Sequence, residues 1–172
     1  GMRHATALGL TPELWVGDFD SSGSELRIDY KQVERQQFPP EKNATDGELA
    51  VDEALRRGAT SLILVGGLGG QADHVTAHLA LLIKLAAQSI ASFGTSGREE
   101  AWPILPAQQF TTEPGMRLSI VPWSDLHGLD LSGVRWPLAK RNVPVGSTLT
   151  LSNVATGPVE MRVEKGSGIV FI

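Results

Sequence analysis

The distribution of apolar residues changes near residue 100, and this change restricts the possible folds more than any other feature of the sequence. Before it, short apolar runs alternate with segments of helical spacing, a pattern typical of parallel strands joined by crossover helices. After it, short apolar runs are separated only by turn residues such as Gly, Pro, Asn and Ser, which is typical of a β-sandwich. We therefore predict an α/β domain with a doubly wound, mostly parallel sheet over residues 1–98, followed by a small all-β sandwich domain over residues 99–172.

The individual elements follow from apolar spacing and from cap residues. Gly9 is placed where a left-handed glycine ends a helix. Thr45 and Glu48 form the capping-box pair that opens a second helix, which Gly58 ends. A longer helix is expected over residues 73–88. The expected strands cover residues 14–16, 61–65, 90–93, 101–105, 117–121, 129–134, 148–152, 159–163 and 169–172.

The charge balance argues against nucleic acid as a partner, because the formal net charge is −4 and no basic surface is expected. The chain has no cysteine, so disulfides and Cys-based zinc sites are excluded and a reducing compartment is favoured. The longest apolar run, 77–87, is interrupted by His78 and Lys84, so no membrane span is expected. These features predict a cytoplasmic protein that binds neither nucleic acid nor membrane.

Two acidic residues follow the first expected strand. Asp18 and Asp20 are two positions apart, so in extended chain their carboxylates face one side, with about 6–7 Å between the Cα atoms. This spacing suits Mg²⁺, which takes one or two carboxylates and completes its octahedron with phosphate oxygens and water. A surface loop in which Asp caps a turn is the alternative explanation.

A second polar cluster lies at the start of the expected helix after Thr45. Thr45 and Asp46 stand where the free N–H groups and the helix dipole favour anions. Lys42, just before them, is placed to meet a phosphate at the same helix start. Capping alone also explains Thr45 and Asp46.

The third cluster is a glycine-rich turn over residues 66–70, which allows a ligand to approach the backbone closely. It does not match the lysine-bearing phosphate loop. Asp73 and His74 follow at a helix start, where they either cap the helix or reach a metal or nucleotide. His78 lies four residues beyond His74, but a zinc site formed by these two histidines has no obvious third ligand.

Taken in order, these segments resemble the thiamine pyrophosphokinase (thiamine diphosphokinase) family. That family carries G-D-x-D-S, then P-x-x-K-D-x-T-D, then G-G-x-G-G-R-x-D-H. The chain has GDFDS at 17–21, PPEKNATD at 39–46 and GGLGGQADH at 66–74. The segment GVRWPL at 133–138 is similar to the family's G-[LV]-[KR]-[YW]-P-L, and residues 146–153 are similar to its S-x-S-N region. The resemblance covers almost the whole chain.

The resemblance implies an Mg²⁺-dependent homodimer that transfers a diphosphoryl group from ATP to the hydroxyl group of thiamine and releases AMP. It implies that the α/β domain binds the nucleotide and that the β-sandwich helps to hold thiamine at the subunit interface. The implied catalytic residues are Asp18, Asp20, Lys42, Asp46 and Asp73, of which Asp18, Asp20 and Asp46 are the implied metal ligands. Those implied for ATP are Ser21, Thr45, Gln71 and His74, and those implied for thiamine are Ser152, Asn153 and Phe171.

The sequence departs from the family pattern at several positions. Asn43 replaces an Asp, Gln71 replaces an Arg and thereby removes a fixed positive charge, and His78 replaces an Asn. The chain also begins inside the family's first helix, so the first βα unit is expected to be missing. Two alternative functions follow: a catalytically weak relative that binds thiamine or nucleotide, and a diphosphokinase or phosphatase that acts on another alcohol.

The C-terminal residues 169–172 are all large and apolar, and such a chain end needs cover on both faces. We predict that a second subunit supplies this cover in a two-fold dimer, whereas the alternative is a central strand within one sandwich. Among the tryptophans, Trp15 and Trp136 are expected in the core. Trp102 and Trp123 are expected to pack, with a groove for the thiazolium ring as the alternative.

Overall fold

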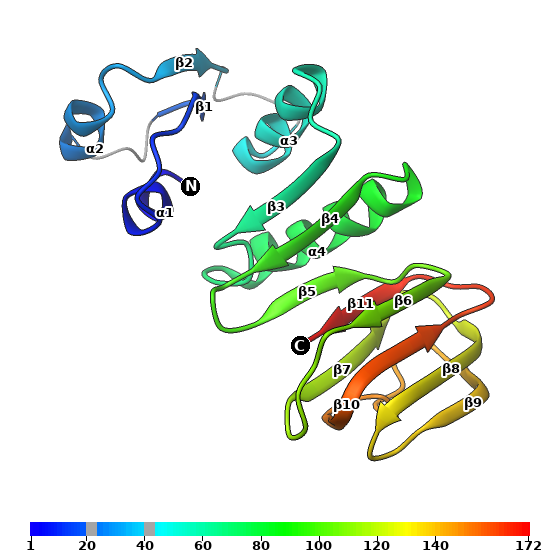
Figure 1. Cartoon of the computed structure of the whole chain (residues 1–172). Coiled ribbons are helices and arrows are strands. Elements are labelled where there is room, and N and C mark those ends of the chain that lie inside the picture. The colour runs from blue at the N-terminus through cyan, green and yellow to red at the C-terminus, as the bar shows by residue number, and fades with distance from the viewer. Residues whose placement is uncertain (20–23, 40–43) are drawn as a thin grey trace.

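A computed structural model describes residues 1–19, 24–39 and 44–172 (Figure 1). The predicted site residues Asp20, Ser21 and Lys42, and the substitution Asn43, lie outside the described residues. In chain order the elements are α1 (Met2–Ala7), β1 (Leu14–Gly17), α2 (Ser24–Asp29), β2 (Glu34–Gln37), α3 (Asp46–Arg56), β3 (Ser61–Val65), α4 (Ala72–Ala87), β4 (Ala91–Thr95), β5 (Glu100–Pro103), β6 (Ala107–Phe110), β7 (Arg117–Pro122), β8 (Leu126–Val134), β9 (Leu138–Val143), β10 (Asn153–Arg162) and β11 (Gly168–Phe171).

The first part of the chain alternates strands and helices, as predicted. β1 pairs in parallel with β2, and β3 pairs in parallel with β4. These two pairs belong to separate sheets, because within the described ranges β1 pairs only with β2 and β3 only with β4. The single doubly wound sheet that we predicted is therefore not formed by these residues. None of the helices in the described ranges is both long and apolar enough to cross a membrane.

Cap residues set the helix ends in this part. Gly9 follows α1 with φ +64°, the left-handed conformation that glycine tolerates, as predicted. Thr45 caps α3, and its Oγ1 accepts a hydrogen bond of 3.2 Å from the N–H of Glu48. The Glu48 carboxylate does not complete the capping box; it instead accepts a hydrogen bond of 3.0 Å from Nζ of Lys84 and so links α3 to α4.

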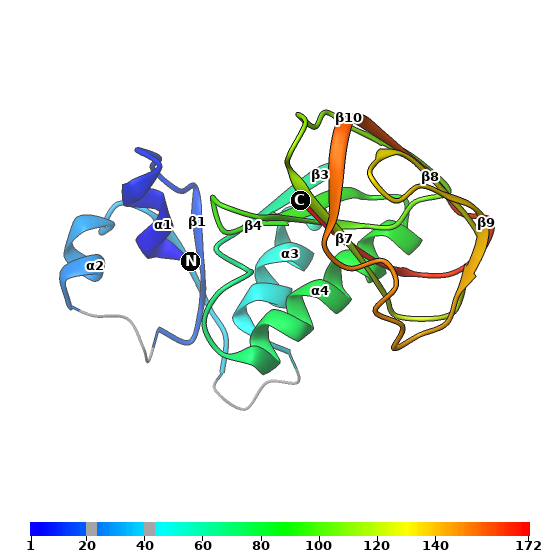
Figure 2. The same ribbon diagram turned by 90° about the horizontal axis from the view of Figure 1, so that it is seen from below.

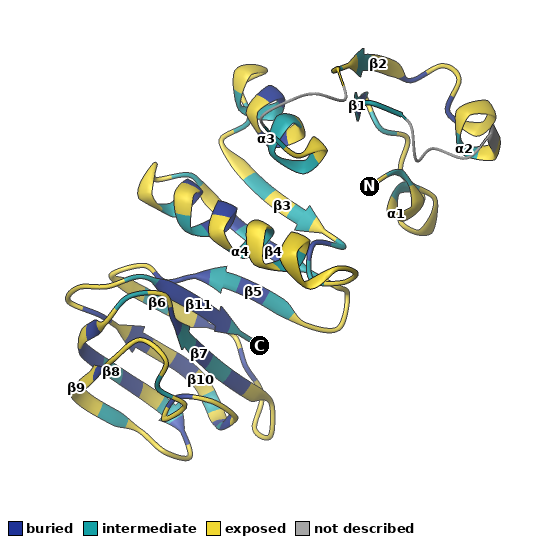
Figure 3. Ribbon diagram, turned by 180° about the vertical axis from the view of Figure 1, so that it is seen from behind, coloured by how far each residue is buried: buried dark blue, intermediate teal, exposed yellow. Residues whose placement is uncertain are grey.

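The second part of the chain is built from antiparallel strands that surround one apolar core. The large sheet has the order β3-β4-β5-β11-β7-β10-β8-β9, with β6 paired to β10. The core includes the fully buried Ile120, Leu126, Leu129 and Val159. Figures 1 and 2 show these strands gathered on one side of α4, and Figure 3 shows that β11 is largely buried, whereas β8 and β10 carry both buried and exposed residues. The sheet runs without a break across the predicted boundary at residue 98, so both predicted domains share it.

The C-terminal strand is covered within its own chain. β11 lies between β5 and β7, antiparallel to both. Ile169 and Val170 are completely buried without any second subunit. The apolar composition of β11 is thus explained by the alternative, a central strand inside one subunit. It no longer argues for a dimer.

Some strand and core predictions were wrong. The predicted strand 148–152 forms turns, while β9 pairs with β8 despite its polar residues. Trp136 is 55% exposed rather than in the core, and Arg135 lies over its ring. Trp15 is buried as predicted, beside Tyr30 and Val33.

A buried glutamate connects α3 to its surroundings. Glu53 accepts hydrogen bonds of 2.7 Å from Nε and Nη2 of Arg56, and one of 2.6 Å from Nε of Arg57. Arg57 also pairs with Glu34 of β2 at 2.7 Å. These hydrogen bonds, first from Arg56 and then from Arg57, lower the pKa of Glu53 to about 2. The cluster therefore stabilises the contact between α3 and β2 while Glu53 is ionised.

We expect this cluster to lose its stabilising effect in acid. The Glu53 pKa is lower in the folded chain than in the unfolded chain, so its contribution is complete above about pH 4.5 and fades as the pH falls toward about 2. Urea unfolding between pH 2.5 and 6 measures this. Glu53→Gln should flatten the acid limb of stability against pH, whereas the exposed control Glu13→Gln should leave it unchanged. Equal acid limbs in the wild type and Glu53→Gln contradict the prediction.

Candidate functional site

Two of the three predicted metal ligands lie where β1 ends and α3 begins. Asp18 follows β1 directly, and Asp46 is the first residue of α3. The Asp46 side chain lies against Gly17, since a Cβ placed on Gly17 would be 2.9 Å from Oδ2 of Asp46. Only glycine at position 17 permits this contact. The Asp46 carboxylate thus packs on the backbone next to Asp18, so two of the three predicted metal ligands lie at one sheet edge.

The glycine-rich turn after β3 has a fixed base and an open tip. The N–H of Gly66 donates a hydrogen bond of 2.7 Å to the carbonyl oxygen of Thr95, at the end of β4. His4 of α1 packs directly on Gly66, where a side chain would collide with the imidazole. Gly69 and Gly70 face open space, with no atom within 4 Å of a Cβ placed there. The tip therefore offers backbone that a ligand can approach.

The helix after this turn carries three further predicted residues. Gln71 caps α4 without a side-chain hydrogen bond to the helix. Oδ1 of Asp73 accepts a hydrogen bond of 2.8 Å from the N–H of His74. All three side chains are exposed at the start of α4. They share this end of the molecule with the turn, whose base is tied to the end of β4.

His78 has a role that the sequence analysis missed. Its Nδ1 lies 3.0 Å from the carbonyl oxygen of Gly67, and its ring also lies against Gly47 in the first turn of α3. No group of three or more His, Cys, Asp or Glu side chains that could hold a metal occurs within the described ranges. Within the described residues, a zinc site formed by His74 and His78 therefore has no third ligand. Glycines at 47 and 67 were the available signal, because each leaves room for a ring.

The three residues predicted to contact thiamine lie on β11 and at the start of β10, which are separated by β7. Phe171 of β11 pairs with Ser119 of β7, and Oγ of Ser119 accepts a hydrogen bond of 2.9 Å from the N–H of Ser152. Asn153 follows at the start of β10. Phe171 also belongs to an apolar cluster that includes Leu68 of the glycine-rich turn. A continuous series of contacts therefore joins the turn to this part of the β-strands.

Several polar atoms of these residues already have partners. Oγ of Ser152 accepts a hydrogen bond of 2.8 Å from Nη2 of Arg117. Asn153 is buried, its Oδ1 accepts from the N–H of Trp136 at 3.2 Å, and its Nδ2 donates to the carbonyl oxygen of Trp136 at 2.9 Å. Asn153 thus fixes the turn after β8. Its contact with thiamine stays a prediction.

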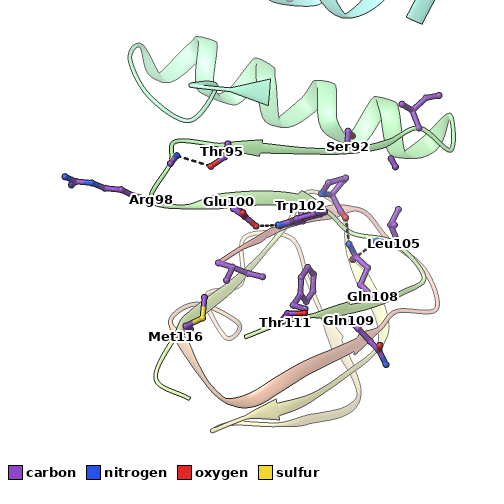
Figure 4. Close-up of a pocket in the computed structure, with 16 residues that line it drawn as sticks. Ser92, Thr95, Arg98, Glu100, Trp102, Leu105, Gln108, Gln109, Thr111 and Met116 are labelled. Carbon is purple, nitrogen blue, oxygen red and sulfur yellow. Dashed lines mark hydrogen bonds between the residues drawn. The ribbon is translucent and has the colours of Figure 1, made fainter. Parts of the chain in front are cut away.

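A cavity of about 750 Å³ lies between β4, β5 and β6 (Figure 4). The Trp102 ring on its wall stacks on Phe93 with 4.2 Å between centroids, and Nε1 of Trp102 donates a hydrogen bond of 2.9 Å to Glu100. Gln108, which also lines it, donates to the carbonyl oxygen of Pro103 at 3.0 Å. Trp102 therefore packs, as predicted, while one side of it borders open space.

We expect Trp102→Ala to lower the free energy of unfolding by about 2–4 kcal/mol, because it removes the ring that packs between Phe93 and Phe110. Urea unfolding measures the loss, and the more exposed Trp123→Ala is the matched control, with an expected loss below about 1 kcal/mol. Equal losses in the two variants contradict a packing role. If thiamine quenches the tryptophan fluorescence of the wild type but not that of Trp102→Phe, the result supports the alternative in which Trp102 lines a groove for the thiazolium ring.

Comparisons with known proteins agree with these features. The family model for the thiamin pyrophosphokinase catalytic domain matches residues 1–93, and that for the thiamin pyrophosphokinase vitamin B1 binding domain matches residues 108–170. A thiamine pyrophosphokinase from Bacillus subtilis (strain 168) is 30% identical over 151 residues, which cover 84% of this chain and 70% of that protein.

Solved structures show the same similarity. A thiamine pyrophosphokinase from Bacillus subtilis superposes with a TM-score of 0.89 at 27% identity, over 99% of this chain and 83% of that one. A thiamin pyrophosphokinase family protein from Enterococcus faecalis gives 0.85 at 25% identity, over 99% and 83% of the respective chains. Yeast thiamin pyrophosphokinase gives 0.79 at 14% identity, over 98% and 71%, and shows similarity of fold.

Proposed function

The chain belongs to the thiamine pyrophosphokinase family, and we infer from this membership that it transfers a diphosphoryl group from ATP to the hydroxyl group of thiamine. The products are thiamine diphosphate and AMP. One structural observation carries most weight for the site: the Asp46 carboxylate packs on Gly17 beside Asp18, at the end of a parallel strand. Ligands of parallel sheets bind at this edge.

The residues at this edge fit a magnesium ion. Mg²⁺ takes one or two carboxylates and fills its other positions with phosphate oxygens and water. The Asp46 carboxylate lies against Gly17, the residue before Asp18, so the chain brings two aspartates to this edge. We propose that these two hold the ion, together with Asp20. Bound Mg²⁺ neutralises charge on the phosphates and on the group in transfer.

The remaining residues position the nucleotide. The N-terminus of α3, with Thr45 as its cap, presents N–H groups and a favourable dipole to anions. The open tip at Gly69 and Gly70 admits a phosphate chain close to the backbone. Lys42 is proposed to balance phosphate charge, and Ser21, Gln71 and His74 are proposed to complete the ATP site.

The transfer itself needs few chemical groups from the protein. The hydroxyl oxygen of thiamine forms a bond to the β-phosphorus of ATP, the bond from that phosphorus to the oxygen bridging to the α-phosphorus breaks, and AMP leaves with this oxygen. The hydroxyl proton passes to a carboxylate or to water. We propose that Asp73 orients the hydroxyl group, because it is exposed at the start of α4 beside the turn. Catalysis then consists of positioning and charge neutralisation.

Thiamine is proposed to bind near Phe171, Ser152 and Asn153. The contacts from Leu68 through Phe171 to Ser119 and Ser152 lead from the turn to this region. A homodimer, in which a second subunit completes the thiamine site, remains a proposal that rests on the family resemblance.

Incubation of the protein with ATP, Mg²⁺ and thiamine tests the function directly. We expect AMP and thiamine diphosphate in equal amounts, and no product when EDTA replaces Mg²⁺. Pyrimidine and pterin alcohols serve as alternative acceptors. Binding of thiamine without AMP formation supports the catalytically weak relative, and faster turnover of another alcohol overturns thiamine as the substrate.

A further inference from the structure

His78 connects three elements that form the proposed nucleotide site. The residue lies in the second turn of α4 and is partly buried. Its Nδ1 is 3.0 Å from the carbonyl oxygen of Gly67, at the base of the glycine-rich turn. A Cβ placed on Gly47 would lie 3.2 Å from its Nε2, so the other side of the ring touches the first turn of α3.

The contact with Gly67 determines which ring nitrogen carries a proton. A carbonyl oxygen only accepts hydrogen bonds, so Nδ1 of His78 must be the donor. A Cβ placed on Gly67 would lie 3.4 Å from this nitrogen, so the ring is also in van der Waals contact with the turn. The ring therefore lies between two glycines, and a side chain at position 47 would require the ring to shift.

This arrangement fixes the spacing between two groups of the proposed site. Gly47 follows Asp46, whose carboxylate packs on Gly17, while Gly67 precedes the open tip at Gly69 and Gly70. The ring of His78 contacts both α3, at Gly47, and the glycine-rich turn, at Gly67. A shift of its hydrogen bond would therefore move the turn relative to Asp46.

We propose that His78 is a positioning residue, which holds the base of the glycine-rich turn at the distance from Asp46 that diphosphoryl transfer requires. The proposal rests on the proposed function, because it assigns Asp46 and the turn to the same nucleotide. Misplacement of reacting groups by about 1 Å lowers turnover by about 100-fold, so a small shift is sufficient. His78 itself touches neither substrate nor metal in this assignment.

Two substitutions separate the hydrogen bond from the bulk of the ring. The amide nitrogen of His78→Asn reaches the position of Nδ1 and keeps the donor to Gly67. The amide of His78→Gln lies farther out, near the position of Nε2, and loses this donor. We expect His78→Asn to keep kcat within about 3-fold of the wild type and His78→Gln to lower it by about 10- to 100-fold, with KM for thiamine changed less than about 3-fold. His127→Gln, an exposed histidine on β8, is the matched control.

A second measurement does not depend on activity. Nitrogen-15 NMR of the histidine rings at pH 8, above the ordinary histidine pKa, should show one ring protonated at Nδ1, and this signal should vanish in His78→Gln. Hydrogen exchange at the turn should speed up in His78→Gln and stay unchanged in His78→Asn. If no histidine ring of the wild type is protonated at Nδ1, or if that signal persists in His78→Gln, the proposal is overturned, even when the variants are unstable.

The outcomes also distinguish the proposed function from the positioning role of His78. A wild-type protein without diphosphokinase activity contradicts the proposed function, and the NMR and exchange results then still decide whether His78 fixes the turn. If the wild type is active and His78→Asn, His78→Gln and His127→Gln all have the same kcat, only the positioning role is overturned. Equal losses in His78→Asn and His78→Gln overturn it as well, because the donor at Nδ1 would then have no effect.

Discussion

Asp46→Asn is expected to lower kcat by at least about 100-fold, and Asp18→Asn by a similar factor, while each variant stays folded. Both changes keep the shape of the side chain and remove the charge that the proposed Mg²⁺ and phosphates require. Asp46 is exposed at the first turn of α3, where a negative charge contributes only about 0.3–1 kcal/mol to stability. Turnover should therefore fall far more than the free energy of unfolding.

Steady-state kinetics, calorimetry of Mg·ATP binding and urea unfolding measure the three quantities. Asp52→Asn provides a matched control, since Asp52 is an exposed aspartate on the same helix, about two turns away from Asp46. It should leave all three unchanged. Normal Mg·ATP binding and normal turnover in both Asp18→Asn and Asp46→Asn would show that the metal assignment is wrong.

The sequence was sufficient to place several helix ends and to place residues of the proposed site after strands and at helix starts. Gly9 marked the end of α1 and Thr45 marked the start of α3, because these positions have a conformation or a hydrogen bond that few residues supply. The order of strand and helix then placed Asp18 and the glycine-rich turn after strands. These inferences depend only on local chemistry, which a sequence records directly.

Contacts between distant elements could not be derived in this way. β2, with the sequence ERQQ, has no apolar residue to reveal a strand, and it forms because β1 pairs with it. The packing of Asp46 on Gly17 and of His78 on Gly67 depends on which helix crosses which strand. The cover of β11 by β5 and β7 is equally non-local, so its apolar residues suggested a second subunit instead.

Deletion of residues 168–172 is expected to abolish folding of the whole chain, because β11 stabilises both of its parts. Successive residues of a strand face opposite sides. Ile169 packs with Leu82 of α4 and Ala101 of β5, while Val170 belongs to the core of the antiparallel strands. The strand also pairs along both edges. Circular dichroism and limited proteolysis of the truncated chain should show an unfolded protein.

Single substitutions show whether the two parts unfold together. Ile169→Ala and Val170→Ala should each lower the free energy of unfolding by about 2–4 kcal/mol, since both side chains are completely buried. Val145→Ala, at an exposed valine, is the control and should cost little. Because one sheet joins β3 to β9, hydrogen exchange in α4 and in β8 should speed up by the same factor in each variant. If Val170→Ala speeds exchange in β8 and leaves α4 unchanged, residues 1–98 and 99–172 unfold as independent domains and the coupling through β11 is refuted.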